Sequence, residues 1–157
     1  MRNSRIEVRP IAGSIGAEIH GIDLSQPVDD AAFARLHDAL MAHAVVFFRD
    51  QRLDPDAQMA LSRRFGEPLF SKKLKLYGDK YDSMSLLEND GTKIAVGSVW
   101  HTDNTDFDAP PLGSLLYCEV APSVGGDTIW SSMTAAYEAL APATKAHLET
   151  LYALHDN

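Results

Sequence analysis

Trp100-His101-Thr102-Asp103-Asn104-Thr105 is the stretch whose geometry the rest of the chain has to support. In an extended segment, alternate side chains leave the backbone on the same face, so His101 and Asp103 can converge while Thr102 points the other way. An imidazole and a carboxylate together suit divalent iron, because two histidines and one carboxylate on one face of an octahedron leave the opposite positions open. The same pattern also fits a surface histidine beside an N-capping aspartate, so by itself it leaves both interpretations open.

The composition is that of one globular domain without the charge of a nucleic-acid-binding protein. The sequence has 157 residues, of which 45% are hydrophobic, which is enough to fill one core. It contains 14 basic and 22 acidic residues, giving a formal net charge of −8. This balance argues against nucleic acid and anionic membranes as partners, and it favours small molecules or proteins.

Two further features bear on location and redox chemistry. The opening residues, MRNSRIEVRP, contain no apolar targeting segment, and no later window has the length of apolar sequence needed to span a bilayer. These observations predict a cytoplasmic protein. The single cysteine, Cys118, excludes an internal disulfide and a cysteine-built zinc site, and its neighbours in LLYCEV predict a buried strand residue.

Two helices are predicted in the first half of the chain. Residues 29–44 repeat apolar side chains at helical spacing, with Leu36 in the middle of the stripe and one aspartate of Asp29-Asp30 as the cap. Asp54-Pro55 starts a second helix, because the carboxylate can accept from free amides of the first turn while proline needs no partner there. Gly66 is its predicted end.

Strands are predicted on both sides of these helices. Residues 6–9 and 17–20 fit two short strands joined by tight turns, and the continuously apolar run 45–48 fits a strand buried on both faces. Further strands are predicted over 83–87 and 114–120. The mixture of strands and helices, without repeat or linker, indicates a mixed α+β fold.

The last part of the chain continues this mixture. Residues 128–130 are predicted to resume the sheet after a turn at Gly125-Gly126. Two helices follow, one capped within Ser131-Ser132 and one with Pro142 in its first turn.

Six blocks of sequence, in order along the chain, resemble one known family over most of the chain's length. This is the taurine dioxygenase and 2,4-dichlorophenoxyacetate dioxygenase (TauD/TfdA) family of iron(II)- and 2-oxoglutarate-dependent oxygenases. Several blocks at the expected separations are far more specific than any one of them. The blocks are Ile15-Gly16-Ala17, Gly21-Ile22-Asp23-Leu24, Val45-Val46-Phe47-Phe48-Arg49-Asp50-Gln51, Arg64-Phe65-Gly66-Glu67, Trp100-His101-Thr102-Asp103 and Gly125-Gly126-Asp127-Thr128.

The resemblance implies a partial double-stranded β-helix, or jelly roll, with flanking helices. It implies that residues 1–157 are the N-terminal portion of a single TauD/TfdA-like oxygenase domain, which is then truncated. Carried over by position, His101 and Asp103 resemble two of the three iron ligands of the family. Thr128 matches the threonine whose hydroxyl helps to hold the distal carboxylate of 2-oxoglutarate, and the alternative for Thr128 is a strand residue that packs by its methyl group.

The resemblance also shows what the chain lacks. In this family a second histidine completes the iron site, and an arginine beyond it pairs with 2-oxoglutarate; both come from sequence downstream of Asn157. His155 belongs to a Leu-x-Ala-x-His-Asp block that the family carries without using it as a ligand. We therefore assign none of the other histidines to metal, and we expect the 157-residue chain alone to be inactive.

The implied activity is that of an Fe(II)- and 2-oxoglutarate-dependent dioxygenase. It uses O2 to hydroxylate a small, anionic organic substrate, with release of succinate and CO2. Members that act on taurine present a histidine and a tyrosine after the Phe-Gly-Glu block and an asparagine before Trp-His. Ser71, Leu74 and Gly97 stand at these approximate positions here, so they are substrate-pocket candidates and argue against taurine. Four lysines in 72–80 fit either attraction of an anionic substrate or a solvated loop.

Two rival interpretations stay open. A zinc hydrolase could use the same His-x-Asp pair with a metal-bound water, although no general base is recognisable and the Gly-Gly-Asp-Thr block is then unexplained. A truncated, catalytically inactive family member could act only as a fragment or interaction module. A homo-oligomer is open under either interpretation.

Overall fold

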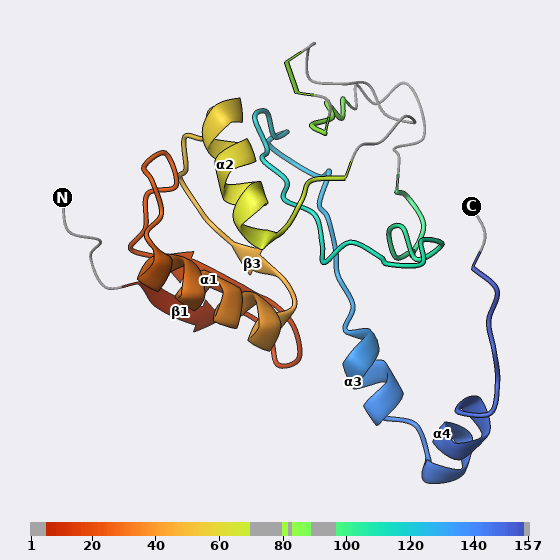
Figure 1. Ribbon diagram of the computed structural model, residues 1–157. Coiled ribbons are helices and arrows are strands. Elements are labelled where there is room, and N and C mark those ends of the chain that lie inside the picture. Colours follow the sequence, from red (N-terminus) through yellow and green to blue (C-terminus); the bar gives the residue numbers. More distant parts are fainter. Residues whose placement is uncertain (1–5, 70–79, 82, 89–96, 156–157) are drawn as a thin grey trace. The chain divides into compact units, whose positions relative to one another are not determined.

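The computed structural model describes residues 6–69, 80–81, 83–88 and 97–155. Helices and strands both occur, as the sequence predicts for a mixed fold (Figure 1). Among the described residues, no helix has the length and apolar character needed to cross a membrane. The elements are β1 (Glu7–Pro10), β2 (Ala17–His20), α1 (Asp30–His43), β3 (Val46–Phe47), α2 (Pro55–Phe65), α3 (Met133–Glu138) and α4 (Pro142–Leu148).

The chain divides into two compact units. The first unit combines Met1–Leu61 with Tyr117–Ala153, and the second combines Ser62–Leu116 with Leu154–Asn157. The sheet, α1, α3 and α4 belong to the first unit, whereas His101 and Asp103 belong to the second. Each unit is therefore assembled from two separate stretches of the sequence.

A three-stranded sheet in the order β1-β2-β3 forms the base of the first unit. β1 and β2 run antiparallel, with Val8 opposite Ile19, and β2 and β3 run parallel, with Ala17 opposite Val46. A parallel pair needs a crossover connection, and α1 supplies it and lies against β2 and β3. The buried apolar side chains of the described residues all come from 6–61, so the core lies here.

The predicted cap and apolar stripe of α1 are both present. The Asp29 carboxylate accepts a hydrogen bond from the Ala32 amide at 2.8 Å, which satisfies one free donor of the first turn. Leu36 is 1% exposed, in the middle of the buried stripe. α2 begins as predicted, because the Asp54 carboxylate accepts from the Ala57 amide at 2.8 Å.

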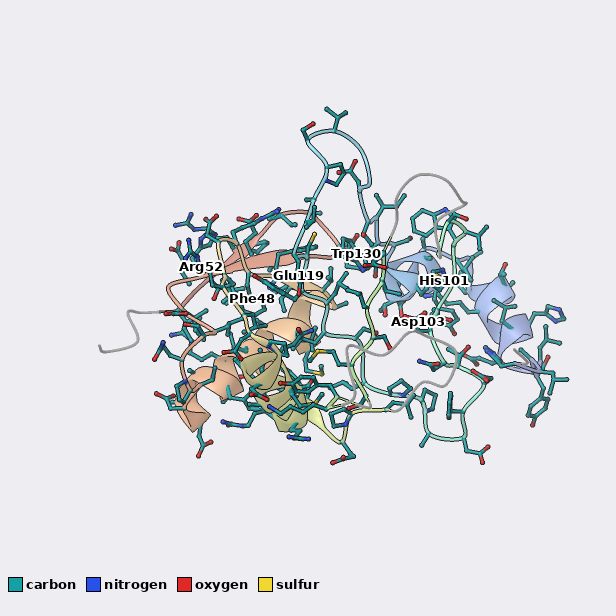
Figure 2. All side chains as sticks on the ribbon, turned by 90° about the horizontal axis from the view of Figure 1, so that it is seen from above. Phe48, Arg52, His101, Asp103, Glu119 and Trp130 are labelled. Carbon is teal, nitrogen blue, oxygen red and sulfur yellow. The ribbon has the colours of Figure 1, made fainter. Side chains whose placement is uncertain are left out.

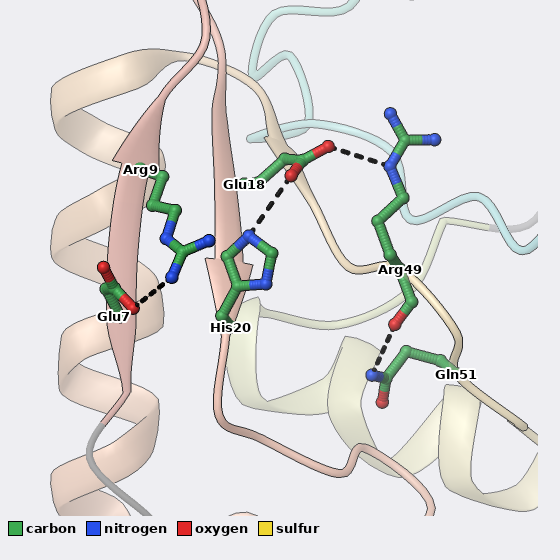
Figure 3. A network of polar contacts seen from close by, with 6 residues as sticks. All are labelled: Glu7, Arg9, Glu18, His20, Arg49 and Gln51. Atoms are coloured by element: carbon green, nitrogen blue, oxygen red, sulfur yellow. Dashed lines mark hydrogen bonds and ion pairs between the residues drawn. The ribbon is translucent and has the colours of Figure 1, made fainter.

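A polar network links the segment after β3 to β2, the central strand of the sheet (Figure 3). Arg49 Nε donates to Glu18 on β2 at 2.9 Å, and the other Glu18 oxygen lies 3.2 Å from His20 Nε2. The hydrogen bond from Arg49 holds the pKa of Glu18 below its ordinary value. Gln51 adds a second link, because its side chain donates to the Arg49 carbonyl at 2.9 Å and accepts from the Leu24 amide at 2.8 Å.

Several strand predictions are wrong in the described residues. Neither 114–120 nor 128–130 forms a strand, and 83–87 contributes only an isolated bridge at Ser85. A strand requires a hydrogen-bonded neighbour as well as a suitable pattern, and the described sheet ends after three strands. The described elements accordingly form a small sheet with helices. The jelly roll that the resemblance implies stays a prediction.

Two burial predictions are also corrected. The run 45–48 is half-buried, and only Val46–Phe47 pairs as a strand. The Phe47 ring instead meets Trp130 edge-on, with the ring centroids 5.1 Å apart. Cys118 is exposed, because its segment pairs with no strand within the described residues.

Candidate metal centre

His101 and Asp103 lie in an irregular part of the second unit, and their side chains converge as their spacing predicts (Figure 2). His101 Nε2 lies 3.3 Å from Asp103 Oδ1. Both side chains are open to solvent, with 48% of His101 and 62% of Asp103 exposed. A ligand or ion can therefore reach the pair without rearrangement of a core.

The other ring nitrogen of His101 has a fixed partner. Nδ1 lies 2.7 Å from the carbonyl oxygen of Val99, and a carbonyl oxygen can only accept a hydrogen bond. Nδ1 is therefore the nitrogen that carries hydrogen in the neutral ring, and Nε2 presents its lone pair toward Asp103. Metal-binding histidines in proteins are commonly held this way, with one nitrogen bonded to a carbonyl and the other to the metal.

The resulting donor set fits a divalent metal ion. In the neutral tautomer, lone-pair atoms of His101 and Asp103 face each other at 3.3 Å, an approach that either a proton on Nε2 or a metal ion between the two atoms would favour. Two ligand atoms about 2.1 Å from one ion and at right angles to each other are about 3 Å apart. The observed separation is close to this value, so the pair could hold one ion with little movement.

His101 and Asp103 have no third candidate ligand beside them within the described residues. No group of three histidine, cysteine, aspartate or glutamate side chains that could hold a metal occurs in the part of the chain that the structure describes. All the histidines of the sequence lie in that part. That none of the other histidines joins His101 and Asp103 at a metal stays a prediction from the sequence.

The remaining predicted site residues are placed in different regions. Thr128 is exposed and follows the turn at Gly125-Gly126 in the first unit. Gly97 belongs to the second unit and lies beside His101, because a Cβ at Gly97 would be 3.1 Å from the ring atom Cε1. Ser71 and Leu74 lie outside the described residues.

Sequence reasoning missed two neighbours of the site. The Val99 carbonyl is a backbone group, which every residue has, so its contact with His101 cannot be predicted from the residue type. His155 Nδ1 lies 2.9 Å from the Thr105 hydroxyl, two residues after Asp103, although the two residues are 50 positions apart in sequence. Val99, Thr105 and His155 all belong to the second unit. A sequence pattern gives no signal for a single contact over such a separation.

Known proteins are similar to this chain in sequence. The model of the taurine catabolism dioxygenase TauD, TfdA family matches residues 7–157. An alpha-ketoglutarate-dependent sulfate ester dioxygenase from Pseudomonas putida is 38% identical over 154 residues, which cover 97% of this chain and 50% of that protein. An alkylsulfatase from Acinetobacter baylyi is 38% identical over 154 residues, covering 98% of this chain and 48% of that protein.

A solved structure agrees with these relatives. A taurine dioxygenase from Burkholderia xenovorans is 31% identical and superimposes with a TM-score of 0.75, over 92% of this chain and 51% of that one. The chain thus spans about half the length of the curated relatives it matches. With a family match over nearly all of its residues, the chain belongs to the taurine catabolism dioxygenase TauD, TfdA family.

Proposed function

We propose that this chain is part of an iron(II)- and 2-oxoglutarate-dependent dioxygenase that hydroxylates a small organic anion and releases succinate and CO2. Members of its family use iron(II), 2-oxoglutarate and O2. The observation that carries the proposal is the 3.3 Å approach of His101 Nε2 to Asp103 Oδ1, with the other ring nitrogen occupied by a carbonyl. This arrangement leaves the two lone pairs directed at one ion.

Each residue has a defined part in this proposal. His101 gives the Nε2 lone pair and Asp103 a carboxylate oxygen to the iron, while the Val99 carbonyl fixes the ring orientation. Thr128 donates its hydroxyl hydrogen to the distal carboxylate of 2-oxoglutarate. When bound, iron supplies the oxidative decarboxylation of 2-oxoglutarate coupled to hydroxylation of the substrate. The proposal includes a jelly roll, of which residues 1–157 are the N-terminal portion.

The substrate proposed for this site is a small organic anion, with sulfate esters first among the classes to test. Two relatives are named as a sulfate ester dioxygenase and an alkylsulfatase, and both are 38% identical to this chain. The four lysines in 72–80 add positive charge in a chain whose net charge is −8. Ser71, Leu74 and Gly97 are the proposed pocket residues.

Anion recognition can be tested with two ligands that share a butyl chain, one with and one without a sulfate group, and with taurine as a third. In a Trp130→Phe variant, the fluorescence of Trp100, next to His101, is titrated with butyl sulfate, butanol and taurine in the presence of Mn(II) and 2-oxoglutarate. We expect butyl sulfate to saturate the signal at about tenfold lower concentration than butanol, because it adds a charge-assisted contact. Equal affinity for butanol, or tighter binding of taurine, would contradict the substrate assignment.

The metal site itself is tested by measuring bound iron under anaerobic conditions. We expect His101→Ala and Asp103→Ala each to lower iron affinity at least tenfold, because each removes one ligand atom. His147→Ala is the matched control, since His147 is an exposed histidine on α4. If His101→Ala binds as much iron as the unchanged chain, the proposed site is wrong.

A further inference from the structure

We propose that His155 is a positioning residue for the iron site, which it stabilises by holding Thr105 at the end of the ligand-bearing stretch. The inference rests on the proposed function, because it concerns the segment that carries His101 and Asp103. His155 itself is not a ligand in this account. It acts through Thr105 on the backbone that presents the two ligands.

The geometry of the contact supports this role. His155 Nδ1 and Thr105 Oγ1 are 2.9 Å apart, which is hydrogen-bond distance for a nitrogen and a hydroxyl. Thr105 follows Asp103 by two residues, so this bond fixes the chain just beyond the second ligand. Leu154–Asn157 is grouped with Ser62–Leu116 in the same compact unit, in agreement with this contact.

The stretch 101–105, which carries both proposed ligands, is otherwise held only by local contacts among the described residues. We call the hydrogen bond from His155 to Thr105 its anchor. His101 is held by Val99, two residues away, and the Asn104 carbonyl accepts from the Phe107 amide at a long 3.4 Å. Asn104 also has a left-handed backbone with φ of +54°. Neither contact ties the stretch to a segment distant in sequence. The bond from His155 spans 50 positions and limits the movement of Asp103 relative to His101.

The expected effect follows from the strength of one hydrogen bond. A hydrogen bond of ordinary net strength corresponds to a change of about two- to tenfold in an equilibrium constant. His155→Ala and Thr105→Val should each weaken Mn(II) binding by this factor, as measured by electron paramagnetic resonance on the whole chain. The double variant should lose no more than either single variant, because both remove the same contact.

Conservative variants separate positioning from a general loss of stability. His155→Asn retains a polar atom near the place of Nδ1, and Thr105→Ser retains the hydroxyl, so both should recover most of the Mn(II) affinity. His147→Ala and Thr144→Val, two exposed positions on α4, should bind Mn(II) as the unchanged chain does. The urea midpoint should stay constant across the set, because the bond lies at an exposed site.

The outcomes distinguish this inference from the proposed function. If His155→Ala and Thr105→Val bind Mn(II) like the unchanged chain while His101→Ala does not, the anchor has no role and the metal site stands. If His101→Ala leaves Mn(II) binding unchanged, the proposed function fails. The metal-free chain then still tests the anchor, since His155→Ala should shift the amide resonances of 101–105. Unchanged resonances would overturn the inference.

Discussion

At the scale of single residues, the orientation of His101 is set by backbone groups on two sides of its ring. The Val99 carbonyl binds Nδ1 at 2.7 Å, and the turn at Gly97 lies against the edge that carries Cε1. Gly97 has φ of +79°, a left-handed conformation that side chains rarely adopt. The residue that the sequence offers as a pocket candidate thus also lies against the ring of His101, the first proposed iron ligand.

Replacing this glycine should weaken the metal site. In Gly97→Ala the new Cβ would lie 3.1 Å from Cε1, so the His101 ring has to shift by a few tenths of an ångström from the position that its contact with Val99 sets. We expect Mn(II) affinity to fall by about tenfold, the usual scale when support of a ligand is lost. Measurement is by titration of the metal-free chain.

A matched glycine separates the contact from backbone strain. Gly125 has a similar φ of +76° and would meet nothing within 4 Å if it gained a Cβ. Gly125→Ala therefore imposes the same backbone strain without touching His101, and its Mn(II) affinity should stay near that of the unchanged chain. Equal losses in the two variants would show that strain, and not contact with the ring, is responsible.

The residues of the site differ in how far sequence could predict them. Convergence of His101 and Asp103 follows from the alternation of side chains along an extended segment, and the structure places their atoms 3.3 Å apart. Val99 contributes a carbonyl, which every residue has, so its role carries no sequence signal. The bond from His155 to Thr105 depends on the path of the chain over 50 positions, which local patterns do not encode.

At the scale of elements, the link between Glu18 and Arg49 couples β2 to the segment after β3. The hydrogen bond from Arg49 lowers the pKa of Glu18. Because the folded-state pKa is depressed, the stabilisation is complete above the unfolded-state value of about 4.3 and is lost as the pH falls through the lower folded-state value. The pair therefore contributes to stability at pH values above the folded-state pKa of Glu18.

Removal of the Glu18 charge should accordingly have an effect that depends on pH. We expect Glu18→Gln to lower the urea midpoint at pH 7, and we expect the difference from the unchanged chain to close only as the pH falls through the lowered pKa of folded Glu18, below which both chains carry a neutral group. Asp108→Asn removes the same charge from an exposed residue as a control. A difference that persists unchanged into acid would show that the effect is not due to the ionised carboxylate.

Local signals predicted the elements whose partners are near in sequence. The caps at Asp29 and Asp54 determine where α1 and α2 begin, and both are confirmed. The strand predicted over 114–120 is wrong, although its pattern is suitable, because alternation describes which face a side chain would occupy and not whether a neighbouring strand is present. Without a neighbouring strand, the apolar side chains of this segment stay exposed: Leu116 is 69% exposed and Val120 is 89% exposed.

At the scale of the whole molecule, the number of proposed iron ligands leads to a prediction about the activity of this chain alone. The described residues contain no group of three metal-binding side chains, and they include every histidine of the sequence. A site with two ligands should bind iron weakly and couple oxygen poorly to a substrate. We expect the chain incubated with iron(II), 2-oxoglutarate, ascorbate and O2 to form no more succinate than its His101→Ala variant.

The contrary outcome would be equally informative. Turnover that depends on His101 in the 157-residue chain would show that the third ligand lies within these residues or comes from a second copy of the chain. Analytical ultracentrifugation under assay conditions distinguishes these two cases, because only the second requires a dimer.

The arrangement of the two units has a consequence for the order in which the chain folds during synthesis. The backbone passes from one unit to the other at 61–62, 116–117 and 153–154. The sheet and its crossover helix, all before residue 48, can form as soon as they leave the ribosome. Tyr117–Ala153 joins this unit only after the stretch with both ligands has been made, and His155 follows later still. The stretch with the proposed iron ligands is thus synthesised before the histidine that anchors it.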